Sequence, residues 1–140
     1  MQCIAPKPAH TRPERQARHS FPGLPHQVGE ARRWALKTLT SWGQEAPEQF
    51  PLVVTELATN ALDHTHSGGA GGQFTLRLAL HAGHIRITVR DAGPRQGRTP
   101  TRRTPNLSAQ HGRGLTLVDA LTRAWGPLKI GTGVFAEVPR

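Results

Sequence analysis

The chain has 140 residues, which is enough for one domain with a single buried core and too short for two. One cysteine excludes a disulfide framework within the chain, and no apolar run reaches the length of a membrane helix. The formal net charge is +9, and no secretory apolar segment follows the basic start, so we expect a cytoplasmic protein with no membrane partner.

The N-terminal segment differs in composition from the rest. Residues 1–18 are rich in proline and arginine without hydrophobic periodicity, which predicts a disordered basic arm before a domain spanning 19–140. A short extended piece is expected at His19–Pro22. A helix is expected from Val28 to a stop at Gly43, because apolar residues recur at helical spacing: Val28, Ala31, Ala35, Leu39 and Trp42.

A second helix is predicted at about Glu48–His64, with Pro51 in its first turn, where a missing N–H is harmless. Its apolar arc consists of Val54, Leu57, Ala58 and Ala61. Alternating residues then predict strands at 74–80 and 85–89, joined as an antiparallel hairpin.

The last third of the chain begins with a long segment, 92–111, that has no period and carries arginines but no acidic residue. A loop of this length in a compact domain is typical of a functional lid or of disorder. A third helix is expected from about Gly114, followed by a hairpin of strands at 125–130 and 134–138. We therefore predict an α+β two-layer sandwich, with helices on one face of a mostly antiparallel mixed sheet.

Three polar residues of the second helix, Glu56, Asn60 and Asp63, follow one another at i, i+4 and i+7. At 100° per residue they form a stripe roughly opposite the apolar arc. Carboxylate and amide oxygens one turn apart suit Mg²⁺, and a carboxylate there can act as a base. An ordinary solvated helix face explains the same stripe, and on this pattern alone it is the favoured interpretation.

Asp91 falls on the same face of its strand as Ile87 and Val89, the face that must be buried. A buried carboxylate needs a hydrogen-bond donor, which a ligand amino group can provide. A local turn at Asp91–Pro94, with the side chain bonded to backbone, is an equally good interpretation.

Gly112-Arg-Gly114 stands directly before a predicted helix and after the arginine-rich segment. Glycines at a helix N-terminus let backbone N–H groups approach a phosphate, although such a pair alone is a weak signal.

Two further functions receive less support. The histidines at 64, 66, 81 and 84 lack the regular spacing of a transition-metal site. The arginines lack interleaved aromatic residues for stacking bases, so we expect no direct nucleic-acid partner.

Taken in order, three segments resemble the motifs of the GHKL (Bergerat-fold) ATPase superfamily. Glu56–His64 resembles the N box, Asp91-Ala-Gly93 the first glycine box, and Gly112–Val118 the second. The helix containing Ala31–Trp34 and the closing Val134–Pro139 resemble the bacterial anti-sigma-factor serine/threonine kinase branch.

This resemblance implies ATP and Mg²⁺ as cofactors, a Bergerat-type sheet and an ATP lid at 92–111. It implies that Asn60 holds magnesium, that Glu56 is the catalytic base or orients the attacking hydroxyl, and that Asp91 receives the adenine amino group. Further ATP contacts are implied at His64, Gly93, Gly112, Arg113, Gly114 and Leu115. Arg95 replaces the second glycine of the first box, and Gly133 stands where the family has a threonine, with Thr132 one place early.

The implied function is an ATP-binding regulator of transcription that phosphorylates an anti-anti-sigma protein on serine or threonine and sequesters a sigma factor; the branch also allows a homodimer. The alternative is a module that sequesters a partner without kinase activity, with or without nucleotide. Intact Glu56 and Asn60 favour the kinase, whereas Arg95 and Gly133 favour the alternative.

Overall fold

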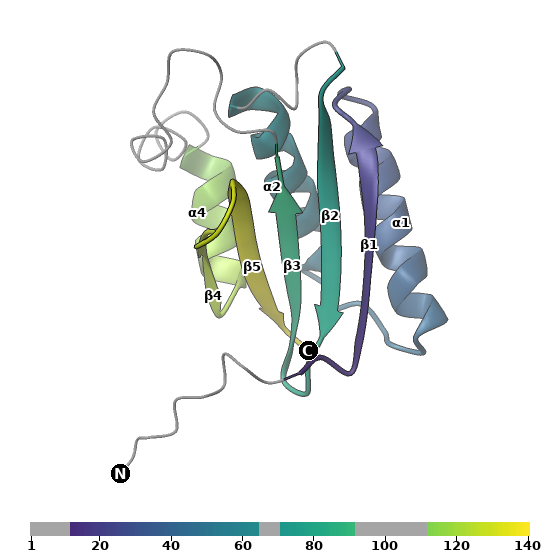
Figure 1. Ribbon diagram of the computed structural model, residues 1–140. Helices are drawn as coiled ribbons and strands as arrows, with labels where there is room; N and C mark the ends of the chain where they lie inside the picture. The colour runs from purple at the N-terminus through teal and green to yellow at the C-terminus, as the bar shows by residue number, and fades with distance from the viewer. Residues whose placement is uncertain (1–11, 65–70, 92–111) are drawn as a thin grey trace.

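The computed structural model describes residues 12–64, 71–91 and 112–140. In chain order its elements are β1 (Arg15–Pro22), α1 (Gln27–Ser41), α2 (Phe50–His64), β2 (Gln73–Leu80), β3 (His84–Arg90), α4 (Gly112–Leu121), β4 (Ala124–Pro127) and β5 (Gly133–Pro139). The strands form one sheet in the order β1-β2-β3-β5-β4. Figure 1 shows this sheet as one layer, with all three labelled helices behind it.

The predicted α+β sandwich with helices on one face is therefore confirmed. All four strand pairings of the described sheet are antiparallel, so the expected mixed character is absent from this part of the chain. The predicted lid, residues 92–111, lies outside the described residues. Among the described helices, none is long and apolar enough to cross a membrane.

The core lies between the sheet and the helices, where alternation along the strands meets the apolar arc of α2. From β2, Phe74, Leu76 and Leu78 point into it, and from β3, Ile85, Ile87 and Val89 do so; all six are fully or almost fully buried. Helix α2 contacts β2, β3 and β5 as well as α1 and α4. Helix α2 is thus shielded from solvent on several sides, and the burial of its apolar residues stabilises the folded state through the hydrophobic effect.

The first strand is longer than the sequence predicts. It begins at Arg15, so residues 15–18, expected in the disordered arm, pair with Arg77–Leu80 of β2. The sequence hides this strand because it is an edge strand, and most of its residues are exposed. Phe21 is its one buried residue; it stacks on Phe74 with ring centroids 5.5 Å apart.

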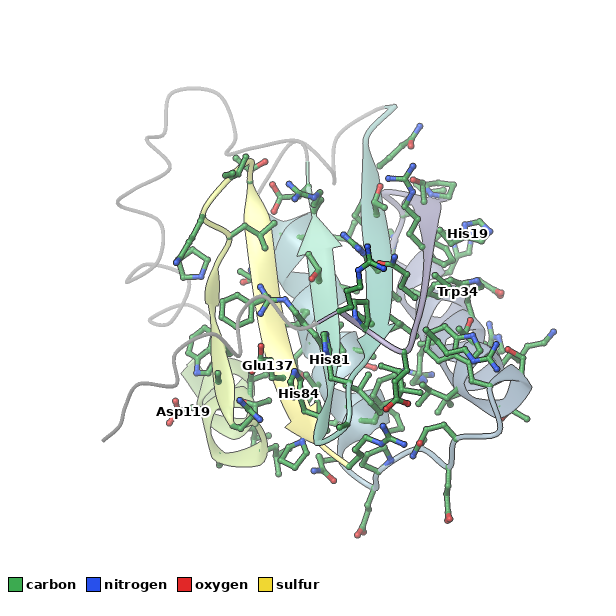
Figure 2. All side chains as sticks on the ribbon, turned by 60° about the horizontal axis from the view of Figure 1, so that its bottom comes forward. His19, Trp34, His81, His84, Asp119 and Glu137 are labelled. Atoms are coloured by element: carbon green, nitrogen blue, oxygen red, sulfur yellow. The ribbon has the colours of Figure 1, made fainter. Side chains whose placement is uncertain are left out.

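Strand β1 is also fastened to helix α1 by aromatic contacts. The Trp34 ring meets His19 and Phe21 edge-on, at centroid distances of 5.8 and 6.1 Å. Figure 2 shows His19 and Trp34 together at this edge of the molecule. Side-chain packing against α1 therefore holds β1 in the folded domain, in addition to its antiparallel pairing with β2.

The remaining predicted elements agree with the structure to within a few residues. Helix α1 is followed by Gly43, whose φ of 73° is the left-handed conformation that commonly ends helices, as predicted. Helix α2 begins at Phe50, which places Pro51 in the first turn. The last hairpin consists of β4 and β5, although its strands begin one residue earlier than predicted.

The backbones of strands β3 and β5 lie close together where Arg90 pairs with Gly133. Gly133 has a φ of 142°, and a Cβ placed on it would collide with the carbonyl oxygen of Val89. The obstacle is backbone, which cannot swing aside as a flexible side chain can. A residue other than glycine at this position therefore strains the ladder at its start.

A polar cluster lies near the opposite end of this strand pair, where Figure 2 labels His81, His84 and Glu137. The imidazole rings of His81 and His84 stack at 4.7 Å, and the His84 Nε2 lies 3.7 Å from the Glu137 carboxylate. Arg86 and Arg123 donate to the same carboxylate at 2.8 and 3.1 Å. Burial lowers the pKa of His84 below its ordinary value of 6.5, and the attraction of Glu137 only partly opposes this effect.

We expect Gly133→Ala to lower the free energy of unfolding by roughly 1–3 kcal/mol, the usual cost of a strained backbone conformation. Chemical denaturation of wild type and variant measures the difference. Gly83→Ala is the matched control, because a Cβ at Gly83 meets open space and its φ is not positive. Equal losses in the two variants would contradict the close approach of β3 and β5.

The lowered pKa of His84 predicts a pH dependence of stability with a definite sign. As the pH falls through 6.5, the unfolded chain gains a proton on this histidine that the folded protein resists, so stability decreases. Denaturation at pH 7.5 and at pH 5.5 should show a smaller loss for His84→Gln than for wild type. Between pH 8.5 and 7.5 the two proteins should change alike; an equal acid loss in both would show that His84 is not responsible.

Candidate functional site

Three of the predicted motifs meet at one end of the molecule. In Figure 1 the C-terminal end of α2, the end of β3 and the start of α4 all lie at the end opposite the chain's C-terminus. Helix α2 contacts both α4 and β3, so the first motif adjoins the elements that carry the other two. Residues separated in the sequence by some fifty positions are thus brought to a common region by the antiparallel topology.

Asn60 is the most informative residue of this region. Its side chain is buried, with 6% of the residue exposed, on a helix whose other buried residues are apolar. Among the described residues, no hydrogen-bond donor reaches its Oδ1. An unsatisfied buried oxygen costs about 1–3 kcal/mol, and native structures seldom keep one without a reason.

The structure thus decides against the solvated-face interpretation for Asn60. The buried surface of α2 is wider than the sequence predicts, because it includes Val53 and extends to Asn60. The stripe is therefore not uniform: Asn60 is buried, Glu56 is half-buried and Asp63 is exposed. Coverage of α2 by two helices and the sheet explains this gradient.

Glu56 lies one helical turn before Asn60, at the boundary between buried and exposed residues. Among the described residues its carboxylate makes no hydrogen bond or ion pair with another side chain. A carboxylate with access to solvent and an unpaired amide oxygen therefore lie side by side on one helix. This set of hard oxygen donors fits Mg²⁺, which prefers a few protein oxygens together with phosphate and water.

Asp91 follows the last residue of β3 and is half-buried. Two hydrogen bonds tie it to Thr132: the Asp91 N–H donates to the Thr132 carbonyl at 3.1 Å, and the Thr132 hydroxyl donates to the Asp91 carbonyl at 2.9 Å. Both bonds use the backbone of Asp91, so they fix the position of this residue without using its carboxylate as acceptor. The local turn at Asp91–Pro94, which was the alternative interpretation, falls on residues 92–94, and these lie outside the described part of the chain.

Thr132 is a residue that the sequence analysis noted as out of place and to which it gave no role in the site. The resemblance directed attention to Gly133, whereas the hydroxyl that lies beside Asp91 belongs to Thr132. Gly133 is needed one position later for a different reason, the close approach to Val89. The Gly-Thr-Gly pattern at 131–133 was the available signal, since a hydroxyl between two glycines in a turn reaches nearby backbone.

The glycine motif at the start of α4 is partly described. The helix begins at Gly112, two residues earlier than predicted, so Gly112 and Gly114 lie in its first turn. The side chains of residues 112–116, including Arg113 and Leu115, and that of His64 lie outside the described part, as does Gly93. A helix N-terminus at this position offers unpaired backbone N–H groups to an anion.

The histidines do not gather into a metal site in the described part of the chain. His81 and His84 stack on each other at the far end of the sheet, and no cluster of three or more metal-binding side chains occurs among the residues described. His66 lies outside the described residues.

Comparison with known proteins adds one family. A sequence model of the histidine kinase-like ATPase domain matches residues 21–126, from the end of β1 into β4. A search of curated proteins finds no match.

Proposed function

This chain belongs to the histidine kinase-like ATPase domain family, an ATP-binding family, and we propose that it binds Mg-ATP at the junction of α2, β3 and α4 and transfers the γ-phosphoryl group to a protein. The observation that supports this most strongly is the buried oxygen of Asn60, which has no hydrogen-bond partner among the described residues and lies one turn from Glu56.

In this proposal Asn60 would hold Mg²⁺ through its amide oxygen. The metal would supply positive charge that stabilises the phosphate groups. The Asp91 carboxylate accepts a hydrogen bond from the adenine amino group, while the contacts with Thr132 keep the residue in place. The backbone N–H groups at the start of α4, beginning at Gly112, donate to phosphate oxygens.

The chemical step needs little covalent help from the protein, chiefly positioning and an oriented nucleophile. A hydroxyl oxygen of the acceptor forms a bond to the γ-phosphorus as the bond between that phosphorus and the β–γ bridging oxygen breaks, and ADP leaves. The hydroxyl proton passes to the Glu56 carboxylate. The position of Glu56 at the edge of the buried surface of α2 supports this role, because Glu56 is accessible to solvent and lies one turn from Asn60.

We further propose that the acceptor is a serine or threonine on a small anti-anti-sigma-like protein, and that the chain also sequesters a sigma factor. The support is the resemblance of residues 31–34 and 134–139 to that branch, together with the partial exposure of Glu56, which leaves it accessible to a docked protein. Transfer to a docked protein predicts little hydrolysis of ATP when the partner is absent.

Asn60→Ala is expected to remove the gain in ATP affinity that magnesium provides, because the substitution deletes the oxygen assigned to the metal. Calorimetric titration with ATP in magnesium and in EDTA measures this gain. Thr59→Ala is the matched control, since Thr59 occupies the same turn but lines a pocket beside α1 that neither Glu56 nor Asn60 lines. Thermal unfolding checks that Asn60→Ala folds. A magnesium gain equal to that of wild type would refute the metal assignment.

Glu56→Gln is expected to bind Mg-ATP like wild type but to transfer phosphate about 10²–10⁴-fold more slowly, the usual contribution of a general base. The assay uses radiolabelled ATP and the proteins that co-purify with the chain from its native extract, with phosphoamino-acid analysis of the product. Glu48→Gln, an exposed carboxylate before the same helix, should transfer normally. If a co-purified partner stays unlabelled with the wild-type chain, the kinase proposal is wrong and the chain is a module that sequesters its partner.

A further inference from the structure

The open face of the sheet, on the side away from the helices, carries a second distinctive feature. Strand alternation places Arg18 of β1, Arg77 of β2, and Arg86 and Arg90 of β3 on this face. Figure 1 views the sheet from this side, with the helices behind. Arg18, Arg77 and Arg90 are exposed.

The charge on this face is not balanced from within the sheet. Glu137 is the one acidic residue that the described strands place there, and it already accepts from Arg86 and Arg123. Arg77 donates to the neutral amide oxygen of Gln16, and Arg90 donates to the Ile130 carbonyl at 3.0 Å. Three exposed guanidinium groups therefore have no carboxylate partner among the described residues.

The pairing of Arg18 with Arg77 makes this imbalance costly. The two residues are direct cross-strand partners in the antiparallel ladder of β1 and β2. Like charges directly opposite each other on one face destabilise a sheet. A cost of this kind in the free protein is offset when an anionic group binds between the two side chains.

We propose that this face binds an acidic segment of a partner protein, whose carboxylates pair with Arg18, Arg77 and Arg90. The planar guanidinium group matches a carboxylate in shape and can donate two parallel hydrogen bonds to it. The Ser20 and Thr75 hydroxyls, 2.7 Å apart on the same face, provide neutral hydrogen-bonding groups beside the arginines. This surface lies across the sheet from α2, so the inference does not depend on nucleotide binding.

Two other occupants agree less well with the observations. A second copy docked symmetrically through this face would place two arginine-bearing surfaces against each other, and contacts between surfaces of like charge are unfavourable. Single-stranded nucleic acid needs aromatic rings on which bases stack. Phe135, the phenylalanine that the described strands place on this face, is covered by the Arg86 guanidinium, which lies 4.0 Å from the ring centroid.

The test compares two labelled probes of equal charge, an oligoglutamate peptide and a single-stranded oligonucleotide, titrated against the full chain without nucleotide. We expect the peptide to bind more tightly than the oligonucleotide. The double variant Arg18→Gln/Arg77→Gln should weaken peptide binding by about tenfold, since two exposed charge contacts are lost. Its thermal stability should equal or exceed that of wild type, because the cross-strand repulsion is removed.

The matched control is Arg33→Gln/Lys37→Gln, which removes the same charge from exposed positions on α1, behind the sheet. This variant should bind the peptide like wild type. If the two double variants lost peptide affinity equally, binding would depend on net charge alone, and the proposal would be overturned. It would also be overturned by tighter binding of the oligonucleotide through Arg18 and Arg77, or by a dimer in sedimentation that the Arg18→Gln/Arg77→Gln variant abolishes.

Discussion

The burial of α2 is the constraint on which both the core and the candidate site depend. This helix packs against three strands and lies between α1 and α4, so almost every residue on its inner side must be apolar. Asn60 breaks that rule, and the same packing that makes it costly also holds its amide in one place. A donor atom fixed by a dense core needs little reorganisation to bind a ligand, because the surroundings have already restricted its freedom. Burial of the Asn60 amide therefore lowers the stability of the fold while it provides the proposed metal ligand, and among the described residues of α2 this conflict concerns Asn60 alone.

The sequence predicted the architecture well because periodicity reflects burial. Large apolar residues alternate along strands β2 and β3 and point into the core, and α2 carries a continuous apolar arc, so the existence and order of these elements followed from the sequence pattern. The prediction missed the first half of β1 because an edge strand whose residues are mostly exposed has no hydrophobic period to detect. It overestimated the solvent exposure of the polar stripe on α2. The width of the buried surface of a helix depends on the neighbouring helices, which the sequence of one segment does not reveal. For the same reason, the burial of Asn60 became visible only in three dimensions.

The surroundings of Asp91 show a different limit of sequence reasoning. A family pattern directs attention to a position in an alignment, whereas the contact depends on which residue of a turn faces the neighbouring strand. Here the ladder of β3 and β5 requires glycine at 133, and the hydroxyl that meets the Asp91 carbonyl comes from Thr132. Thr132 also lies beyond residue 126, where the match to the family ends. The open face of the sheet is a further example, since its arginines come from three strands and only the register shows that two of them are opposed.

The edge position of β1 has a consequence for how the domain avoids self-association. Strand β2 is strongly apolar on its inner face, and without β1 its backbone groups would form a free sheet edge on which another chain could assemble. The first strand covers that edge with a polar, arginine-bearing sequence and ends at Pro22, which has no N–H to offer a further strand. A chain shortened into β1 would keep most of its core, and its first fault would be aggregation through the newly exposed strand. Strand β1, whose first half has no hydrophobic period in the sequence, therefore covers the edge of β2 on which another chain could pair.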